Sequence, residues 1–293
     1  MILVCYSDNP LCTFCMNLNK YEITKFLNNC DLDNSKLWLA EAEFGFSQLK
    51  ETISSLPVNS KILEVGCWSG ILLSVLAEEF SHHKFLGIEP FGDGFSSLKE
   101  LNATVKKLGV NLSIERYEEH QSKYDFIYCV NVFEHVDDWR HFLDWTSNNL
   151  KENGRFFVLC PNYVFPYESH FRIPIIFNKR FTFNIFENYI LNFEKNNKSL
   201  GLWSSLNFVK KRDVLAYCKK NTSKLGLSVN DDTSIIDYMI ERVLMDPEFR
   251  KRQSTIGRVA LLLKAVGILN LIKKFPNFLP YMKLSFSKSM WIK

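Results

Sequence analysis

The stretch that decides the fold is ILEVGCWSG, residues 62 to 70. It begins as an apolar run, carries an acid at Glu64 and then turns through Gly66 and Gly70 into a helix-like segment. Glycine allows the backbone to turn sharply and to approach a ligand closely. The stretch contains neither GxGxxG nor GxxxxGK[ST], so it does not support a dinucleotide-binding fingerprint or a phosphate loop. The pattern predicts a buried strand, a ligand-binding turn and a helix.

Short apolar runs and amphipathic segments continue to alternate on the C-terminal side of this stretch. This alternation predicts an α/β fold with a Rossmann-like, mostly parallel sheet of seven strands and helices on both faces. We expect strands at residues 61–65, 85–89, 112–115, 126–130, 156–160, 227–230 and 284–292, and helices at 71–80, 96–108, 138–150 and 212–222. The pair Asn153-Gly154 is expected to form the turn before the fifth strand.

The pattern divides the chain into four parts. Residues 1–56 are expected to form an N-terminal helical cap, and residues 57–163 the cofactor-binding core. Residues 164–210 are rich in aromatic residues and show no period, and such long irregular stretches are usually functional. We interpret them as a substrate-binding insertion or lid. Residues 211–293 are expected to complete the core with its last two strands, interrupted by a helical insert at 235–280.

A second acid, Glu89, ends the next predicted strand 25 residues after Glu64. In doubly wound sheets ligands bind at the carboxyl ends of the strands, and an acid there can accept both hydroxyls of a ribose. Taken alone, Glu89 is equally consistent with an ordinary solvated residue at the start of a helix. The spacing of the two acids favours a nucleoside site.

These features resemble a known family. The stretch at 62–70 is similar to motif I, [DE]xGxGxG, of class I S-adenosylmethionine (SAM)-dependent methyltransferases, with Trp68 at the middle glycine. The segment YDFIYCVNVFEHVDD, residues 124–138, resembles the branch with quinone and small-molecule O-methyltransferases, and Pro161-Asn162 matches a pair common in the family. The loop at 161–174 resembles that of bacterial methyltransferases encoded with sugar or cell-surface biosynthesis functions. The resemblance covers residues 55–163 well and implies SAM as the cofactor.

The resemblance also implies site residues. The cofactor is expected to contact Glu64, Gly66, Cys67, Trp68, Gly70, Glu89, Pro90 and Asn131. For a hydroxyl acceptor the enzyme must also provide a proton acceptor, and histidine suits this role near neutral pH. We expect His170, oriented by Glu168 or Tyr167, to accept the proton, with His135 as the second catalytic candidate. Helix capping by His135 and loop ordering by His170 are the structural alternatives.

The substrate is expected to be a small molecule or a sugar-type precursor of a cell-surface polysaccharide, and Tyr163, Phe171 and Arg172 are its predicted contacts. Arg172 would bind an anionic part of it. Two alternatives remain open. The string NVFE after the fourth strand differs from the Asn-Pro-Pro-Tyr type of N-methylating relatives, which favours oxygen but leaves N-methylation as a rival. Because Trp68 replaces the middle glycine of motif I, the second alternative is that the chain is a catalytically inactive partner subunit.

The remaining features concern location and partners. Residues 210–293 carry 17 Lys/Arg against 7 Asp/Glu, but no nucleic-acid motif accompanies them, so we expect no nucleic-acid partner. The apolar segment 256–272 contains Arg258 and Lys264 and is too short to span a membrane. It is expected to pack on its own domain or a second copy of the chain, with contact to a membrane surface as the alternative.

The N-terminal residues lack a secretory signal, so a cytoplasmic location is expected. Cys12 and Cys15 form a CxxC without the second close pair typical of a zinc knuckle. The sequence therefore predicts no metal site.

Overall fold

The computed structural model describes residues 35–92, 94, 99–106, 109–245 and 275–289. Three predictions lie outside these residues: the Cys12–Cys15 pair, the first 34 residues of the expected cap, and the apolar segment 256–272. Within the described part of the chain, no helix is both long enough and apolar enough to cross a membrane.

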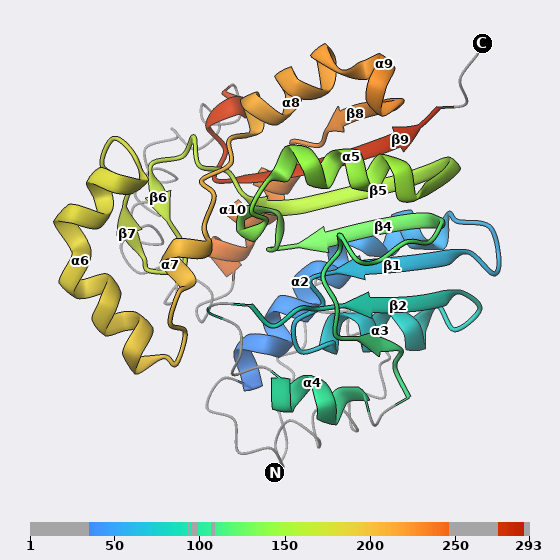
Figure 1. Ribbon diagram of the computed structural model, residues 1–293, viewed down its shortest axis with the longest axis horizontal. Helices are drawn as coiled ribbons and strands as arrows, with labels where there is room; N and C mark the ends of the chain where they lie inside the picture. The colour runs from blue at the N-terminus through green and yellow to red at the C-terminus, as the bar shows by residue number, and fades with distance from the viewer. Residues whose placement is uncertain (1–34, 93, 95–98, 107–108, 246–274, 290–293) are drawn as a thin grey trace.

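One seven-stranded sheet forms the centre of the molecule (Figure 1). Its order is β3-β2-β1-β4-β5-β9-β8, and β9 runs antiparallel to both of its neighbours while the other strands are parallel. This confirms the predicted Rossmann-like, mostly parallel sheet. The strands are β1 (Lys61–Val65), β2 (Lys84–Ile88), β3 (Leu112–Ser113), β4 (Tyr124–Val130), β5 (Leu150–Pro161), β8 (Leu227–Asp231) and β9 (Tyr281–Lys288).

Helices cover both faces of the sheet, as the unbroken apolar run of β4 requires. On one face, Ile127 and Cys129 of β4 join a core cluster with residues of α5 and α8, and on the other Phe126 and Tyr128 join a cluster with α2, α3 and α10. The helices are α2 (Ser35–Ser54), α3 (Ile71–Glu79), α4 (Lys99–Lys106), α5 (Trp139–Asn149), α8 (Lys211–Lys220), α9 (Thr222–Leu225) and α10 (Ile235–Met245). The central strands are therefore rigidly held at the edge where β1 and β4 end.

The stretch between β5 and α8 folds beyond the carboxyl ends of the parallel strands (Figure 1). It contains β6 (Tyr167–Glu168), β7 (Ile173–Pro174), α6 (Lys179–Asn196) and the short α7 (Leu202–Ser205). A hydrophobic cluster of its own holds it together, with Phe171, Ile190 and Trp203 among its buried members. The sequence showed no period here, so the 18-residue helix α6 is a correction to the expected irregular segment.

The pair Asn153-Gly154 does not form the turn that was expected before the fifth strand. Both residues lie inside β5, where the pairing with β4 shifts register between Tyr124 and Phe126. Asn153 has a φ of 61°, which asparagine tolerates better than most residues. The Asn-Gly pair therefore forms a bulge within a continuous strand, and such a bulge bends the strand.

Candidate functional site

The turn between β1 and α3 requires glycine at two positions. Gly66 has a φ of 73°, and a Cβ there would lie 2.4 Å from Cγ2 of Val132. Gly70 has a φ of 80° and precedes the first residue of α3, and a Cβ there would lie 2.9 Å from Cδ1 of Leu112. Because neither position accommodates a side chain, the backbone of the turn packs closely against Val132, just after β4, and against Leu112 of β3.

Glu64 lies near the end of β1 and is almost completely buried, with 4% of its surface exposed. The hydroxyl of Tyr128 on β4 donates to its Oε2 at 3.0 Å. Burial raises the pKa of Glu64 to about 8, although the bond from Tyr128 acts in the opposite direction. A cationic ligand at this carboxyl group would favour its ionised form.

Glu89 follows β2 and joins the same edge through backbone hydrogen bonds. Its Oε2 accepts from the amide of Trp68 at 3.1 Å, and its Oε1 accepts from the amide of Phe91 at 2.9 Å. Burial raises the pKa of Glu89, and these two amides act against that rise. A carboxylate can accept about four hydrogen bonds, so capacity remains for two ribose hydroxyls.

Trp68 forms the outer part of the turn. Its φ of 47° places the backbone in the left-handed region. Its carbonyl accepts from Nδ2 of Asn102 at 2.8 Å, which ties the turn to α4. The side chain is half-buried and lines the pocket. The indole thus stands at the wall of the predicted cofactor site.

A pocket opens where β1, β4 and α2 meet. Its lining includes Glu41, Glu64, Gly66, Cys67, Trp68, Val130 and Asn131. Five predicted cofactor residues are therefore brought together. Gly70 starts the adjoining helix, Glu89 reaches the site through Trp68, and Pro90 beside it is exposed. Oδ1 of Asn131 is buried and has no hydrogen-bond partner among the described residues. It can accept a hydrogen bond from a ligand in the pocket.

Cys67 is also buried within this pocket lining, with 4% of its surface exposed. Burial is the largest cause of a pKa well above that of an ordinary thiol, and the nearby Glu64 and Glu89 add to the rise. The side chain therefore stays an uncharged thiol and acts as a small apolar wall.

The chain leaves β4 through a single 3-10 turn, η2 (Phe133–His135). Asn207, at the end of the insertion, fixes this turn through hydrogen bonds. The amide of Asn207 donates to the carbonyl of Glu134 at 2.7 Å. Its side-chain Nδ2 donates to the carbonyls of Phe133 at 2.8 Å and Val136 at 2.9 Å. The position of η2 therefore depends on the end of the insertion.

His135 is held by α7. Its Nδ1 lies 2.8 Å from Oγ of Ser205, and that hydroxyl donates to the carbonyl of Leu202 at 2.8 Å. The hydroxyl therefore accepts from Nδ1–H, which places the lone pair of the neutral ring on Nε2. Burial lowers the pKa of His135 well below its usual value, and the charges of His170 and Lys179 add to this effect.

His170 lies in the loop between β6 and β7 and is paired with a fully buried carboxylate. Its Nδ1 lies 2.6 Å from Oε1 of Glu168, so Glu168 rather than Tyr167 is the partner that contacts the ring. Glu168 also accepts from the amide of Phe171 at 2.7 Å and the hydroxyl of Tyr163 at 3.2 Å. Burial lowers the pKa of His170, but Glu168 outweighs it and brings the pKa to about 9.

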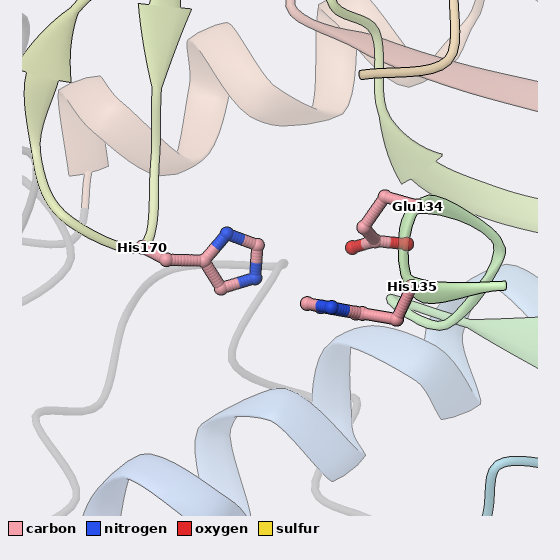
Figure 2. Close-up of side chains that lie close together, drawn as sticks. All are labelled: Glu134, His135 and His170. Atoms are coloured by element: carbon pink, nitrogen blue, oxygen red, sulfur yellow. The ribbon is translucent and has the colours of Figure 1, made fainter. Parts of the chain in front are cut away.

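Glu134 joins the two histidines, and sequence analysis did not identify it. Its side chain is fully buried, and burial raises its pKa to about 8 against the opposing charge of His170. Figure 2 shows the side chains of Glu134 and His135, from η2, directed toward the side chain of His170. Potential ligand atoms of these three residues lie within 4.8 Å of one another. The only signal in the sequence was an acid directly before His135.

The predicted substrate residues have different environments. Phe171 is fully buried and its ring packs 5.0 Å from that of Phe193. This position favours a packing role over the predicted substrate contact. Tyr163 is also buried, and its ring stacks 4.4 Å from that of Phe208. Arg172 is exposed, with a φ of 57°, and its charge lies close enough to Tyr167 to affect that residue's pKa.

Comparison with known proteins agrees with this geometry. The family model described as a methyltransferase domain matches residues 41–208, which include β1 to β5 and most of the insertion. The chain is 33% identical over 223 residues to an uncharacterised protein of Mycobacterium tuberculosis (strain ATCC 25618 / H37Rv), and the match covers 73% of each chain. The chain therefore belongs to this methyltransferase family. The predicted class is confirmed: a SAM-dependent methyltransferase, with SAM as the methyl donor.

Two further proteins are more distant. The chain is 28% identical over 158 residues to a ubiquinone biosynthesis O-methyltransferase of Cronobacter sakazakii, covering 50% of this chain and 62% of that one. Phosphoethanolamine N-methyltransferase 2 of Haemonchus contortus, solved in complex with S-adenosyl-L-methionine, has a TM-score of 0.47 and 12% identity. That match covers 83% of this chain and 51% of the solved chain.

Proposed function

We propose that the protein transfers a methyl group from SAM to a hydroxyl oxygen of a small-molecule or sugar-type acceptor. The observation that carries this proposal is the position of two histidines, His135 and His170, and the buried Glu134 in one cluster at the exit of β4. The cluster adjoins the cofactor pocket: Asn131 lines that pocket two residues before η2 begins. Oxygen acceptors need such proton-handling groups, because a neutral hydroxyl is a weak nucleophile.

Glu41 provides a second link between pocket and cluster. It lines the pocket from α2, and its charge raises the pKa of both Glu134 and His170. An acceptor bound against the cluster is therefore close to a methyl donor in the pocket. Methyl transfer requires this proximity, because the acceptor lone pair must lie in line with the sulfonium methyl group.

In the proposed transfer, the acceptor hydroxyl releases its proton to water at the histidine cluster, its oxygen forms a bond to the methyl carbon, and the carbon–sulfur bond breaks with its electron pair on sulfur. The products are a methyl ether and S-adenosylhomocysteine. The role proposed for His170, held by Glu168, is to assist the loss of the proton in its neutral form, which its pKa of about 9 makes the major form only at higher pH. Exposed Arg172 is proposed to attract an anionic part of the acceptor.

Similarity to the ubiquinone O-methyltransferase supports oxygen as the acceptor atom, as does the string NVFE after β4. The rivals, N-methylation and a catalytically inactive partner subunit, are separated by one experiment. Purified protein is incubated with SAM labelled in the methyl group and a cell extract, and the labelled product is identified. We expect a methyl ether. A labelled methylamine would identify an N-methyltransferase, and S-adenosylhomocysteine binding without any labelled product would favour the inactive subunit.

The variant His170→Gln tests the role of the cluster. With the labelled acceptor in hand, we expect turnover to fall by about 10²–10⁴, because the group that assists deprotonation is lost. Binding of S-adenosylhomocysteine should be unchanged. His141→Asn, at an exposed position on α5, is the matched control and should keep full turnover. Turnover of His170→Gln close to that of the unaltered protein would remove His170 from the reaction.

A further inference from the structure

We propose that Glu134, His135 and His170 bind a divalent transition-metal ion of the zinc type, which holds the acceptor hydroxyl. The inference rests on the proposed function for the identity of the substrate group, but the metal site itself stands on the geometry of the cluster. Each residue supplies one ligand atom, and these atoms lie within 4.8 Å of one another. Sequence analysis predicted no metal site, and the only cysteine pair it weighed lies at residues 12 and 15.

The set of donors selects the class of metal. Two imidazole nitrogens and one carboxylate oxygen suit zinc and related first-row ions, whereas Mg²⁺ and Ca²⁺ prefer oxygen alone. Zinc bonds of about 2.0–2.1 Å in a tetrahedron place ligand atoms roughly 3.3 Å apart. The three side chains therefore need to tighten by only a modest amount around an ion. Their rings are already close, with the centroids of His135 and His170 5.1 Å apart.

Both histidines are oriented as metal-binding histidines are. A ligating imidazole generally donates its second ring N–H to a neighbouring oxygen, which fixes the ring and the position of its lone pair. Nδ1 of His135 is bonded to Ser205 and Nδ1 of His170 to Glu168. Nε2 is then the ligand atom in each ring. The carboxylate of Glu168 is itself fixed by the amide of Phe171.

Glu134 supplies the observation that points most directly to a ligand. Its carboxyl group is 0% exposed, and neither oxygen accepts a hydrogen bond from another described residue. A buried carboxyl group without partners is costly, so nearly all such groups in proteins have a hydrogen-bond donor or a cation beside them. The group is directed toward the two imidazole rings (Figure 2). An ion between the rings would be within its reach.

The charges around the cluster also favour a cation. Glu41 and Glu168 both lie close enough for their charges to act on Glu134. Among the described lysines and arginines, Lys179 is the one whose charge acts on His135, and its Nζ donates to the carbonyls of Ser204 and Leu206. Outside the cluster itself, two carboxylates and one lysine thus act on it.

Three protein ligands leave a coordination position open, as in catalytic zinc sites. An acceptor hydroxyl in that position would lose its proton to solvent water more readily, because the ion stabilises the resulting oxygen anion. That oxygen would then form its bond to the methyl carbon, and sulfur would keep the electron pair of the broken bond. In this arrangement His170 acts on the hydroxyl through the ion.

The experiment measures metal binding directly. The 293-residue chain carries Cys12→Ser and Cys15→Ser, so that those thiolates do not contribute, and is titrated with Co²⁺ and Zn²⁺ after treatment with a chelator. We expect one ion per chain, a visible Co²⁺ spectrum without a thiolate band, and no competition from a large excess of Mg²⁺. Glu134→Gln and His170→Asn should each weaken zinc binding by about 100-fold or more.

Two further variants test the positioning residues and the specificity of the effect. Glu168→Gln should weaken zinc binding by about 10–100-fold, because His170 loses its fixed orientation. His141→Asn should bind zinc as the parent does. Binding of S-adenosylhomocysteine is measured on every variant, and we expect it unchanged, which also shows that each variant is folded.

The proposal is overturned if the parent chain binds no ion, or if Glu134→Gln and His170→Asn bind zinc as tightly as the parent. In either case, a metal-free protein that still binds S-adenosylhomocysteine and labels an acceptor leaves the proposed methyl transfer intact. A protein that binds zinc as described but neither binds S-adenosylhomocysteine nor labels an acceptor refutes the proposed function and keeps the metal site.

Discussion

Glu64 is the residue in which the buried site and the stability of the fold are most directly coupled. Its pKa of about 8 in the folded protein lies far above the value of about 4.3 for a glutamate in an unfolded chain. At a pH below both pKa values the carboxyl group is neutral in the folded and in the unfolded protein, so its burial carries no ionisation penalty. As the pH rises through this interval, ionisation favours the unfolded chain, so the stabilising contribution of the proton is lost up to about pH 8.

The variant Glu64→Gln should remove this pH dependence. Because one pKa unit corresponds to about 1.4 kcal/mol, the free energy of unfolding of the unaltered protein should fall, relative to the variant, by on the order of 3–5 kcal/mol between pH 5 and pH 8.5. Urea unfolding at both pH values measures the difference. The exposed Glu43→Gln on α2 is the control. Equal pH dependence in Glu64→Gln and the unaltered protein would contradict the account.

Single residues also mark the limit of what the sequence could predict. Glu64 and Glu89 were identifiable because each follows or ends a recognisable apolar strand. Glu134 was not, because an acid before a histidine in a loop is normally solvated. Its burial arises from the insertion, which covers η2 through Asn207 from more than 70 residues away. No local pattern carries that information.

At the scale of elements, the β1–α3 turn makes a sharp prediction. Gly66→Ala would place a methyl group against Val132 and force alanine to a φ of 73°. We expect a loss of about 1–3 kcal/mol in the free energy of unfolding and at least a 10-fold weaker affinity for S-adenosylhomocysteine. Gly92→Ala, where a Cβ would meet nothing within 4 Å, is the matched control. Calorimetry and thermal unfolding distinguish the two, and identical behaviour would show that the turn is not tightly packed.

Helix α6 shows why the insertion could not be predicted at the same level. Its buried residues are Thr182, Ile190 and Glu194, while Phe181 and Ile185 are exposed at 44% and 52%. Apolar residues on the outer face and polar residues on the inner face remove the periodicity by which an amphipathic helix is recognised. The strands of the main sheet, with apolar runs buried on both faces, were predicted to within a few residues except for the longer β5.

The core of the insertion can be tested by one substitution. Phe171→Ala removes a fully buried ring packed against Phe193 and Trp203. It should reduce the free energy of unfolding of the insertion by about 3–5 kcal/mol. Phe177→Ala, at a position 87% exposed, should change it by less than about 0.5 kcal/mol. Hydrogen exchange of the insertion, monitored by mass spectrometry, measures both. Equal protection in the two variants would be evidence against an independent core.

At the scale of the whole molecule, the sheet and the insertion provide different parts of the proposed reaction site. The edge of the sheet at β1 and β4, together with α2, supplies the pocket, and the insertion supplies His170 and holds η2 in place. The alternation of strands and helices predicted the mostly parallel sheet, but it did not predict the strand order or the antiparallel direction of β9. The acceptor-side geometry depends on long-range contacts between these two units, and for this reason the sequence predicted its residues only as separate candidates.

The most direct test of the account is calorimetric titration with S-adenosylhomocysteine. We expect the unaltered protein to bind one molecule per chain with micromolar affinity. Glu89→Gln, which removes the charged acceptor beside Trp68, should weaken binding at least 10-fold, or about 1.4 kcal/mol. Glu152→Gln, an exposed acid near the opposite edge of the sheet, should bind as the unaltered protein does. No binding by the unaltered protein, or equal binding by Glu89→Gln, would contradict a cofactor site at this edge.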